Sequence, residues 1–222
     1  MAATPGQLFE RVADTFAMPL VQVKQMDRFL ADAGLRTKTG GRGRNAPKVS
    51  SRDAAHLLIA AAASRNIKDA ADMVHTFGQL PLSPNQEIIV GEDRLSLEKI
   101  EALSANHTFA DALTALIDSV RNGEFDIAIR ARVDSHPLKL LVANIRVELF
   151  QPSAMAKIEV FNFKRCLKMN YDQHPDYSRP DATELLQKQV GSNPRSDLQH
   201  ISTFGLGSIR AIADLLGPEA SA

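Results

Sequence analysis

The sequence has very few of the residues that staple small secreted domains or form metal knuckles. Its 222 residues include one cysteine, no tryptophan and two tyrosines. A single cysteine excludes an intrachain disulfide framework and any all-cysteine metal site within one chain. Net charge is absent as well, because 26 Lys and Arg balance 26 Asp and Glu. This balance argues against the bulk positive charge with which histone-like proteins hold nucleic acid.

Long apolar runs are also missing. The longest, residues 57–63, is far too short to span a bilayer, and the N-terminus has neither the basic nor the apolar region of a signal peptide. Hydrophobic residues still make up 44% of the chain, which is enough for a core and excludes wholesale disorder. We therefore expect an intracellular, cytoplasmic protein with no membrane partner, folded as one large domain or two small ones.

The balanced total conceals separate blocks of charge. The net charges of residues 1–50, 51–80, 81–126, 127–170 and 171–222 are +4, 0, −6, +5 and −3. The sharpest block runs from Arg36 to Arg52, with six basic and no acidic residues in seventeen positions. Like charges at this density repel one another unless an anion neutralises them, and the glycines among them let the backbone approach a phosphate closely. A solvated loop that only maintains solubility is the alternative interpretation.

Two short helices are predicted before this basic block. Thr4 suits a helix cap, with Pro5 at the first helical position and Gln7 completing a capping box. Apolar residues recur at helical spacing over residues 8–16, and a second helical stripe over residues 20–33 ends at Gly34 as a left-handed cap. The face opposite this second stripe carries long donors of the kind that contact phosphates and base edges, namely Gln22, Lys24, Gln25 and Arg28.

A basic hairpin is predicted after Gly34, followed by two more helices. Residues 35–39 and 45–49 suit two short strands around a flexible tip. Ser50 is expected to cap a buried helix over residues 51–63, with Asp53 at the capping-box offset. Asn66 is expected to cap a fourth helix that runs to about residue 77.

This order of elements resembles a winged helix-turn-helix DNA-binding domain. Residues 8–16 correspond to the supporting helix, 17–19 to the turn, 20–33 to the recognition helix and 35–49 to the wing. The stretch GGRGRNAPKVSSRDAAHLLIA is also similar to a pattern in phage and prophage-encoded proteins. The resemblance implies a recognition helix in the major groove and a wing on the flanking backbone or minor groove. The implied DNA contacts are Gln22, Lys24, Gln25, Arg28, Arg36, Lys38, Arg42, Arg44 and Lys48.

The second half of the chain reads as a pair of helices followed by strands. Helices are predicted over residues 95–105 and 109–120. From Phe125 the apolar period becomes two, so we predict strands over 127–133, 138–150 and 155–170, the last long enough to need a bulge or bend. The exposed face of this meander is expected to be basic through Arg130, Arg132, Arg146, Lys157 and Lys164. It is either a half-solvated sheet protected from aggregation by charge or a second nucleic-acid surface.

The end of the chain is expected to hold short elements. Residues 182–190 suit a helix, residues 200–204 a last strand and residues 208–216 a closing helix.

No motif for catalysis or metal binding is found. None of the six histidines is paired with another His or Cys at a ligand spacing, and His56 is interpreted as a satisfied core or interface histidine. The alternation of Asp172, His174 and Asp176 falls in a loop rich in Pro and Tyr, so we do not assign it a metal. Cys166 has no neighbouring acid or base and is interpreted as structural. We expect no cofactor and no enzymatic activity.

Together these patterns predict an α+β protein in three parts. A winged-helix-like module is placed at residues 1–82, a helical connector at 83–124 and an antiparallel β-meander domain for dimerisation or effector binding at 125–222. The predicted function is sequence-specific binding of double-stranded DNA, most simply by a transcriptional regulator of phage or prophage type. A homodimer or higher homo-oligomer is expected, since one small module buries too little surface for useful specificity.

Two other functions stay open at this point. One is a small terminase-like protein of DNA packaging or assembly, which a ring-forming mass in solution favours. The other is a phage inhibitor that binds another protein, which failure to bind any duplex favours.

Overall fold

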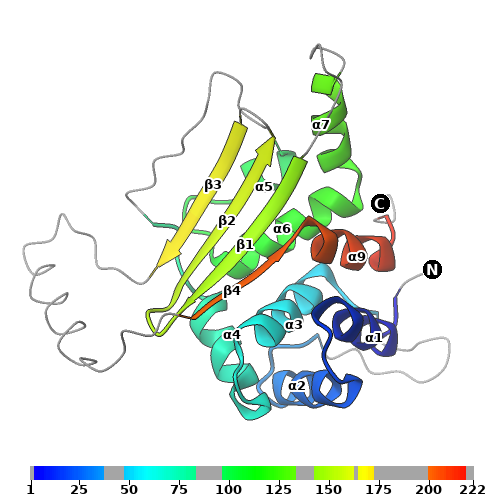
Figure 1. Cartoon of the computed structure of the whole chain (residues 1–222), viewed down its shortest axis with the longest axis vertical. Helices are drawn as coiled ribbons and strands as arrows, with labels where there is room; N and C mark the ends of the chain where they lie inside the picture. The colour runs from blue at the N-terminus through cyan, green and yellow to red at the C-terminus, as the bar shows by residue number, and fades with distance from the viewer. Residues whose placement is uncertain are drawn as a thin grey trace, which may run out of the picture.

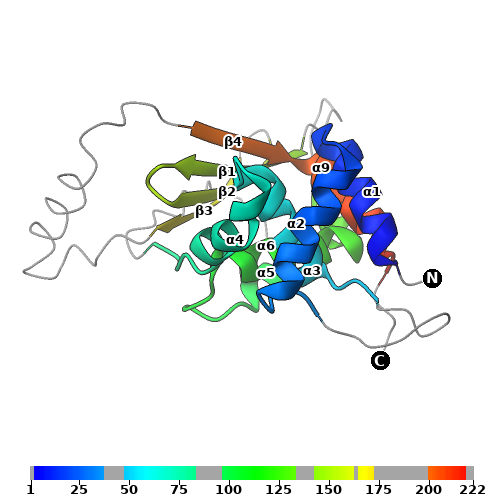
Figure 2. The same ribbon diagram turned by 90° about the horizontal axis from the view of Figure 1, so that it is seen from below.

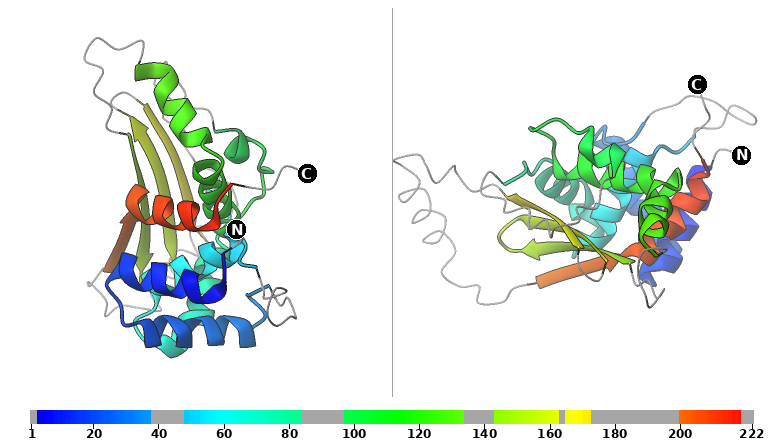
Figure 3. Two further views of the ribbon diagram at one scale, coloured as in Figure 1. Left: turned by 90° about the vertical axis from the view of Figure 1, so that its right-hand side faces the viewer. Right: turned by 90° about the horizontal axis from the view of Figure 1, so that it is seen from above.

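The protein is built from two layers, a four-stranded antiparallel sheet and a layer of helices on one of its faces (Figures 1 and 3). The computed structural model describes residues 3–37, 48–83, 97–133, 143–162, 165–172 and 200–218. The opposite face of the sheet carries none of the described helices (Figure 3). The α+β class predicted from the sequence is therefore confirmed.

Capping boxes start three of the helices, at Thr4, Ser50 and Thr108. The caps predicted at Thr4 and Ser50 are thus confirmed, as is the left-handed Gly34 (φ +75°) after the second helix. The described residues form the helices α1 (Pro5–Phe16), α2 (Leu20–Asp32), α3 (Ser51–Ala63), α4 (Ala70–Gly78), α5 (Glu98–Glu101), α6 (Phe109–Arg121), α7 (Glu124–Val133) and α9 (Leu206–Leu216), and the 3-10 turn η2 (Ile67–Asp69).

Helix α3 forms the centre of the helical layer. Its residues are buried except Arg52 and Ala62, and it packs against α1, α2, α4 and α6. The burial predicted for residues 51–63 is therefore confirmed. One continuous apolar core joins these helices to the sheet and to α9.

The sheet has the strand order β3-β2-β1-β4. Its strands are β1 (Ala143–Gln151), β2 (Met155–Asn162), β3 (Arg165–Asp172) and β4 (His200–Gly205). Alternate residues such as Val147 and Ile158 are fully buried against the helices. At the end of β4, Gly205 lies so close to β1 that an added Cβ would stand 2.6 Å from the Ile145 carbonyl oxygen, which requires glycine at this position.

Two predictions for the second half are wrong. Residues 127–133 belong to the helix α7 and not to a strand, because Phe125 and Ile129 are both buried at a spacing of four residues. Residues 155–170 form parts of two paired strands, β2 and β3, in which Asn162 lies opposite Arg165. A meander is present, but it consists of β1, β2 and β3.

Other elements are shorter than expected or lie outside the described residues. The helix predicted over 95–105 is reduced to the single turn α5, and the helix expected from Asn66 begins as η2 before α4. The strand at 200–204 and the closing helix are confirmed as β4 and α9. The helix predicted over 182–190 lies outside the described residues, and the boundaries at 82 and 124 stay predictions.

Candidate nucleic-acid interface

The outer face of α2 brings together most of the DNA contacts predicted for that helix. Its inner stripe, which includes Val23, Met26 and Leu30, is buried. Since side chains repeat every 3.6 residues, Lys24 and Arg28 point away from this stripe with Gln25 beside them. These three residues are exposed, and Gln22 is half-buried at the margin of the same face.

A three-residue link sets the direction in which α2 leaves α1. Ala17 adopts the left-handed conformation (φ 50°, ψ 40°) and donates its N–H to Ala13 and Asp14 carbonyls at the end of α1. Pro19 then precedes α2. From this link the two helices diverge (Figure 2).

Arg36 is engaged within the protein. Its guanidinium pairs with the carboxylate of Asp27 on α2, and the two side chains are only 15% and 11% exposed. The same guanidinium lies over the Phe9 ring, 5.6 Å from its centre. Burial raises the pKa of the Asp27 carboxyl, and the charge of Arg36 opposes this rise. The structure thus places this predicted DNA contact where it ties the chain after α2 to both α1 and α2.

The described ends of the predicted wing are not strands. The Thr37 N–H donates to an Asp53 carboxylate oxygen at 2.8 Å, and the Val49 N–H donates to the Ala3 carbonyl at 3.2 Å. Burial alone would raise the pKa of the Asp53 carboxyl, but hydrogen bonds from Thr37 and Ser50 outweigh it and hold that pKa below its ordinary value. Asp53 therefore ties both ends of the basic segment (residues 36–50), at Thr37 and at Ser50, to the start of α3.

Three predicted contacts of the wing lie outside the described residues. They are Lys38, Arg42 and Arg44. Lys48, at the end of the basic segment, is exposed. A winged fold is therefore not established here. The two helices predicted before the basic block are present as α1 and α2.

The basic side chains of the sheet are neutralised by neighbouring acids. Lys157 lies 3.4 Å from Glu148 and 2.7 Å from Glu159, and Arg146 lies 3.8 Å from Glu159. Arg130 and Arg132 belong to α7 instead, and Lys164 lies outside the described residues. The predicted basic face is therefore not seen on β1 and β2, because the strand register places a glutamate opposite Arg146 and another opposite Lys157.

Around α2 the cations have no such partners. Five cations are exposed and form no ion pair with another described residue, namely Lys24, Arg28, Lys48, Arg65 and Lys68. An uncompensated cation near the surface attracts anions without first breaking an internal pair. These five cations lie on α2, at Lys48 and on the link after α3, and the carboxylates of Asp32 and Asp69 lie beside two of them, Arg28 and Lys68.

A hollow of about 720 Å³ lies between α2 and the link from α3 to α4. Gln25, Arg28 and Phe29 line it from α2, and Asn66, Ile67 and Lys68 line it from the other side. Sequence reasoning missed the second group, because Asn66 was interpreted only as a helix cap. The basic residues on either side of Asn66 were the available signal.

A smaller polar hollow, of about 340 Å³, lies where the basic segment meets α3. In it, Nδ1 of His56 lies 2.6 Å from the Leu35 carbonyl oxygen. A carbonyl only accepts, so Nδ1 carries the hydrogen. Burial lowers the pKa of the His56 imidazole despite this bond, and Arg52 adds to the lowering. The interpretation of His56 as a satisfied buried histidine is confirmed.

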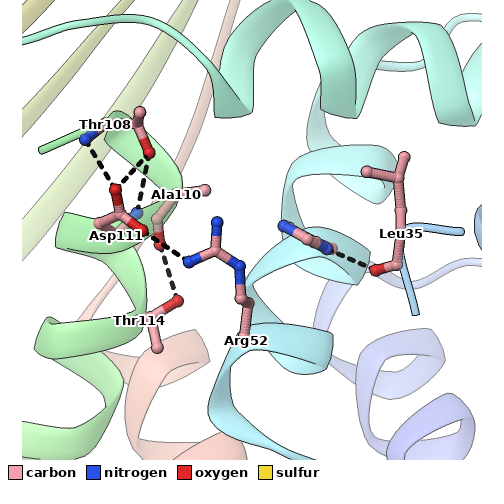
Figure 4. A network of polar contacts seen from close by, with 7 residues as sticks. Leu35, Arg52, Thr108, Ala110, Asp111 and Thr114 are labelled. Carbon is pink, nitrogen blue, oxygen red and sulfur yellow. Dashed lines mark hydrogen bonds and ion pairs between the residues drawn. The ribbon is translucent and has the colours of Figure 1, made fainter. Parts of the chain in front are cut away.

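Arg52 on the same side of α3 is held by α6. Its guanidinium lies 2.5 Å from the Asp111 carboxylate, which also accepts from the Thr108 N–H at 2.9 Å (Figure 4). Two opposing carboxylates, Asp53 and Asp111, and a neutral imidazole thus surround the cations here. Because Arg36 and Arg52 are both engaged in ion pairs, whereas Lys24 and Arg28 form none with another described residue, α2 is the stronger candidate for binding an anionic polymer.

Over the described ranges, no three His, Cys, Asp or Glu side chains are grouped to hold a metal ion. His174 and Asp176 lie outside those ranges. None of the described helices has the length and apolar content needed to cross a membrane.

Comparison of the chain with protein-family models, curated proteins and solved structures found no match.

Proposed function

We propose that this protein binds double-stranded DNA through the outer face of α2, most simply as a sequence-specific transcriptional regulator of phage or prophage type. The proposal is supported by one observation above all. Lys24, Gln25 and Arg28 share an exposed helix face and have no acidic partner among the described residues. A helix of this diameter enters the major groove of B-form DNA.

The side chains suggest distinct roles. Arg28 and Gln25 have the donors to read guanine and adenine edges respectively. Lys24 is suited to a phosphate, and Gln22 to a contact at the margin of the groove. Lys48, with Lys38, Arg42 and Arg44 of the same basic segment, adds phosphate or minor-groove contacts.

A homodimer is part of the proposal. One helix reads only a few base pairs, so useful specificity needs two half-sites about one helical turn apart. The mass of the protein alone and bound to a duplex, measured by light scattering, is expected to show two copies on each site. A ring of many copies would favour the packaging or assembly alternative.

The central experiment is a duplex-binding titration across salt concentrations. Replacing Lys24 with alanine should lower the slope of log affinity against log salt by about 0.9, the contribution of one released counterion, if Lys24 contacts a phosphate. Arg130→Ala is the matched control. Arg130 is also exposed and unpaired among the described residues, but it lies on α7, at the opposite end of the molecule from α2 (Figure 1).

Base reading is tested separately from charge. Selection from random duplexes should enrich one motif, and Gln25→Ala should change the preferred base at one position without changing the salt slope. If the unaltered protein binds no duplex at about 50 mM salt, where phosphate contacts are strongest, the proposal fails and a protein partner becomes the better function.

A further inference from the structure

The link between α3 and α4 presents cations beside the outer face of α2. Arg65 and Lys68 are exposed, and neither forms an ion pair with another described residue. η2, which contains Lys68, packs directly against α2. Lys68 and Arg28 line the same hollow from opposite sides. Two separate segments of the chain therefore place unpaired positive charge on the two rims of one depression.

We propose that Arg65 and Lys68 hold the phosphate backbone of the DNA strand that borders the groove entered by α2. This inference rests on the proposed function and adds a second, sequence-independent contact to it. It gives the α3–α4 link a role that the sequence had suggested for Arg36, which is occupied by Asp27 in this structure.

The acids of the hollow decide where the backbone passes. Asp32 and Asp69 also line it, and Asp69 accepts a hydrogen bond from the Asn66 side chain at 3.2 Å. Two carboxylates repel a phosphate placed inside the hollow. The backbone is therefore expected to cross the rim at Lys68 rather than enter the depression, and to continue toward Arg65, which lines a neighbouring hollow with Gln151 and Pro152.

The apolar lining of the hollow suits the uncharged part of the same strand. Phe29 is 37% exposed and lines the hollow together with Ile67. Apolar side chains in such a position contact deoxyribose or the thymine methyl group, whereas the cations contact phosphates. A lining that combines apolar side chains with Arg28 and Lys68 thus suits both the sugar and the phosphate of one strand.

Single substitutions of Lys68 test the inference in the full-length protein on a mixed-sequence duplex. Lys68→Ala should lower the salt slope by about 0.9 and the affinity by about five- to tenfold at 0.1 M salt. The loss should be the same on every duplex, because a phosphate contact carries no sequence information. Lys68→Arg should keep the slope, and Arg65→Ala should repeat the effect of Lys68→Ala.

Arg130→Ala again serves as the control, since it removes one exposed cation from α7. If the unaltered protein binds duplex but Lys68→Ala and Arg130→Ala leave slope and affinity equally unchanged, the inference is overturned while DNA binding by α2 stands. If Lys68→Ala alters sequence preference instead of slope, the link reads bases and the backbone assignment is wrong. Absence of duplex binding by the unaltered protein would remove both proposals together.

Discussion

Replacing Arg36 with alanine should destabilise the protein and leave its salt-dependent DNA affinity nearly unchanged. The substitution removes the partner of Asp27, a carboxylate that is only 11% exposed on α2. It also removes the cation that lies over the Phe9 ring. The guanidinium therefore acts inside the fold, and its loss should lower the free energy of unfolding.

The size of the effect follows from the burial of the pair. Removing one partner of a fully buried ion pair costs about 3–5 kcal/mol, and the residual exposure of both side chains reduces our expectation to about 2–3 kcal/mol. In a chain of this length that corresponds to a fall in Tm of roughly 5–10 °C. Urea unfolding followed by circular dichroism measures the free energy directly.

The dependence on pH separates this mechanism from a general loss of packing. Burial already raises the pKa of Asp27, and loss of Arg36 must raise it further. The folded variant then binds a proton more readily than the unfolded chain, so its deficit should shrink as pH falls from 7.5 to about 5. Adding Asp27→Asn to the variant should restore part of the stability for the same reason.

An exposed arginine provides the matched comparison. Arg28→Ala should change the free energy of unfolding by less than about 0.5 kcal/mol while lowering the affinity for the preferred duplex. A loss below about 0.5 kcal/mol in Arg36→Ala, or a lower salt slope with unchanged stability, would refute the assignment of Arg36 to the fold.

Three further outcomes are expected. Burial lowers the pKa of His56 from its ordinary 6.5. As the pH falls, the unfolded chain therefore takes up a proton at a higher pH than the folded chain does. The free energy of unfolding should then decrease below about pH 6.5, by at most about 1.4 kcal/mol per pH unit. His56→Gln should flatten that slope in urea titrations, and an equal slope would contradict it. Ser50→Ala removes the cap of α3 and should cost about 1 kcal/mol, or roughly 2–4 °C in a thermal melt, with duplex affinity unchanged. Asp32→Asn should strengthen duplex binding about two- to fivefold by removing a repulsive charge worth up to about 1 kcal/mol, whereas the exposed Asp214→Asn on α9 should not; equal effects would show that only net charge matters.

Local signals in the sequence predicted the N-terminal helices well. The capping boxes at Thr4 and Ser50 need only residues three positions apart, so they do not depend on the rest of the fold. Gly34 ends α2 for an equally local reason, its positive φ. By contrast, the alternating residues 127–133 fit a strand and a helix alike, and burial of Phe125 and Ile129 decides for α7.

Charge pairing depends on contacts that the sequence does not display. Asp27 lies in the buried stripe of α2, between Met26 and Leu30, and an acid in such a position requires a cationic partner. That signal was present, but nothing local identified Arg36 as the partner. The glutamates that neutralise Lys157 likewise depend on the register of β1 against β2, which approximate strand bounds do not fix.

The pairing pattern explains why zero net charge does not oppose DNA binding. At 0.1 M salt, charges on the surface are screened over about 10 Å, so a duplex on α2 responds to the charges of α2 and its immediate neighbours. Acids such as Glu148 and Asp111 are engaged by Lys157 and Arg52 elsewhere in the fold. Binding should therefore depend on the few unpaired cations around α2 and weaken steeply with salt. Variants that alter distant charges should shift the isoelectric point without shifting the affinity.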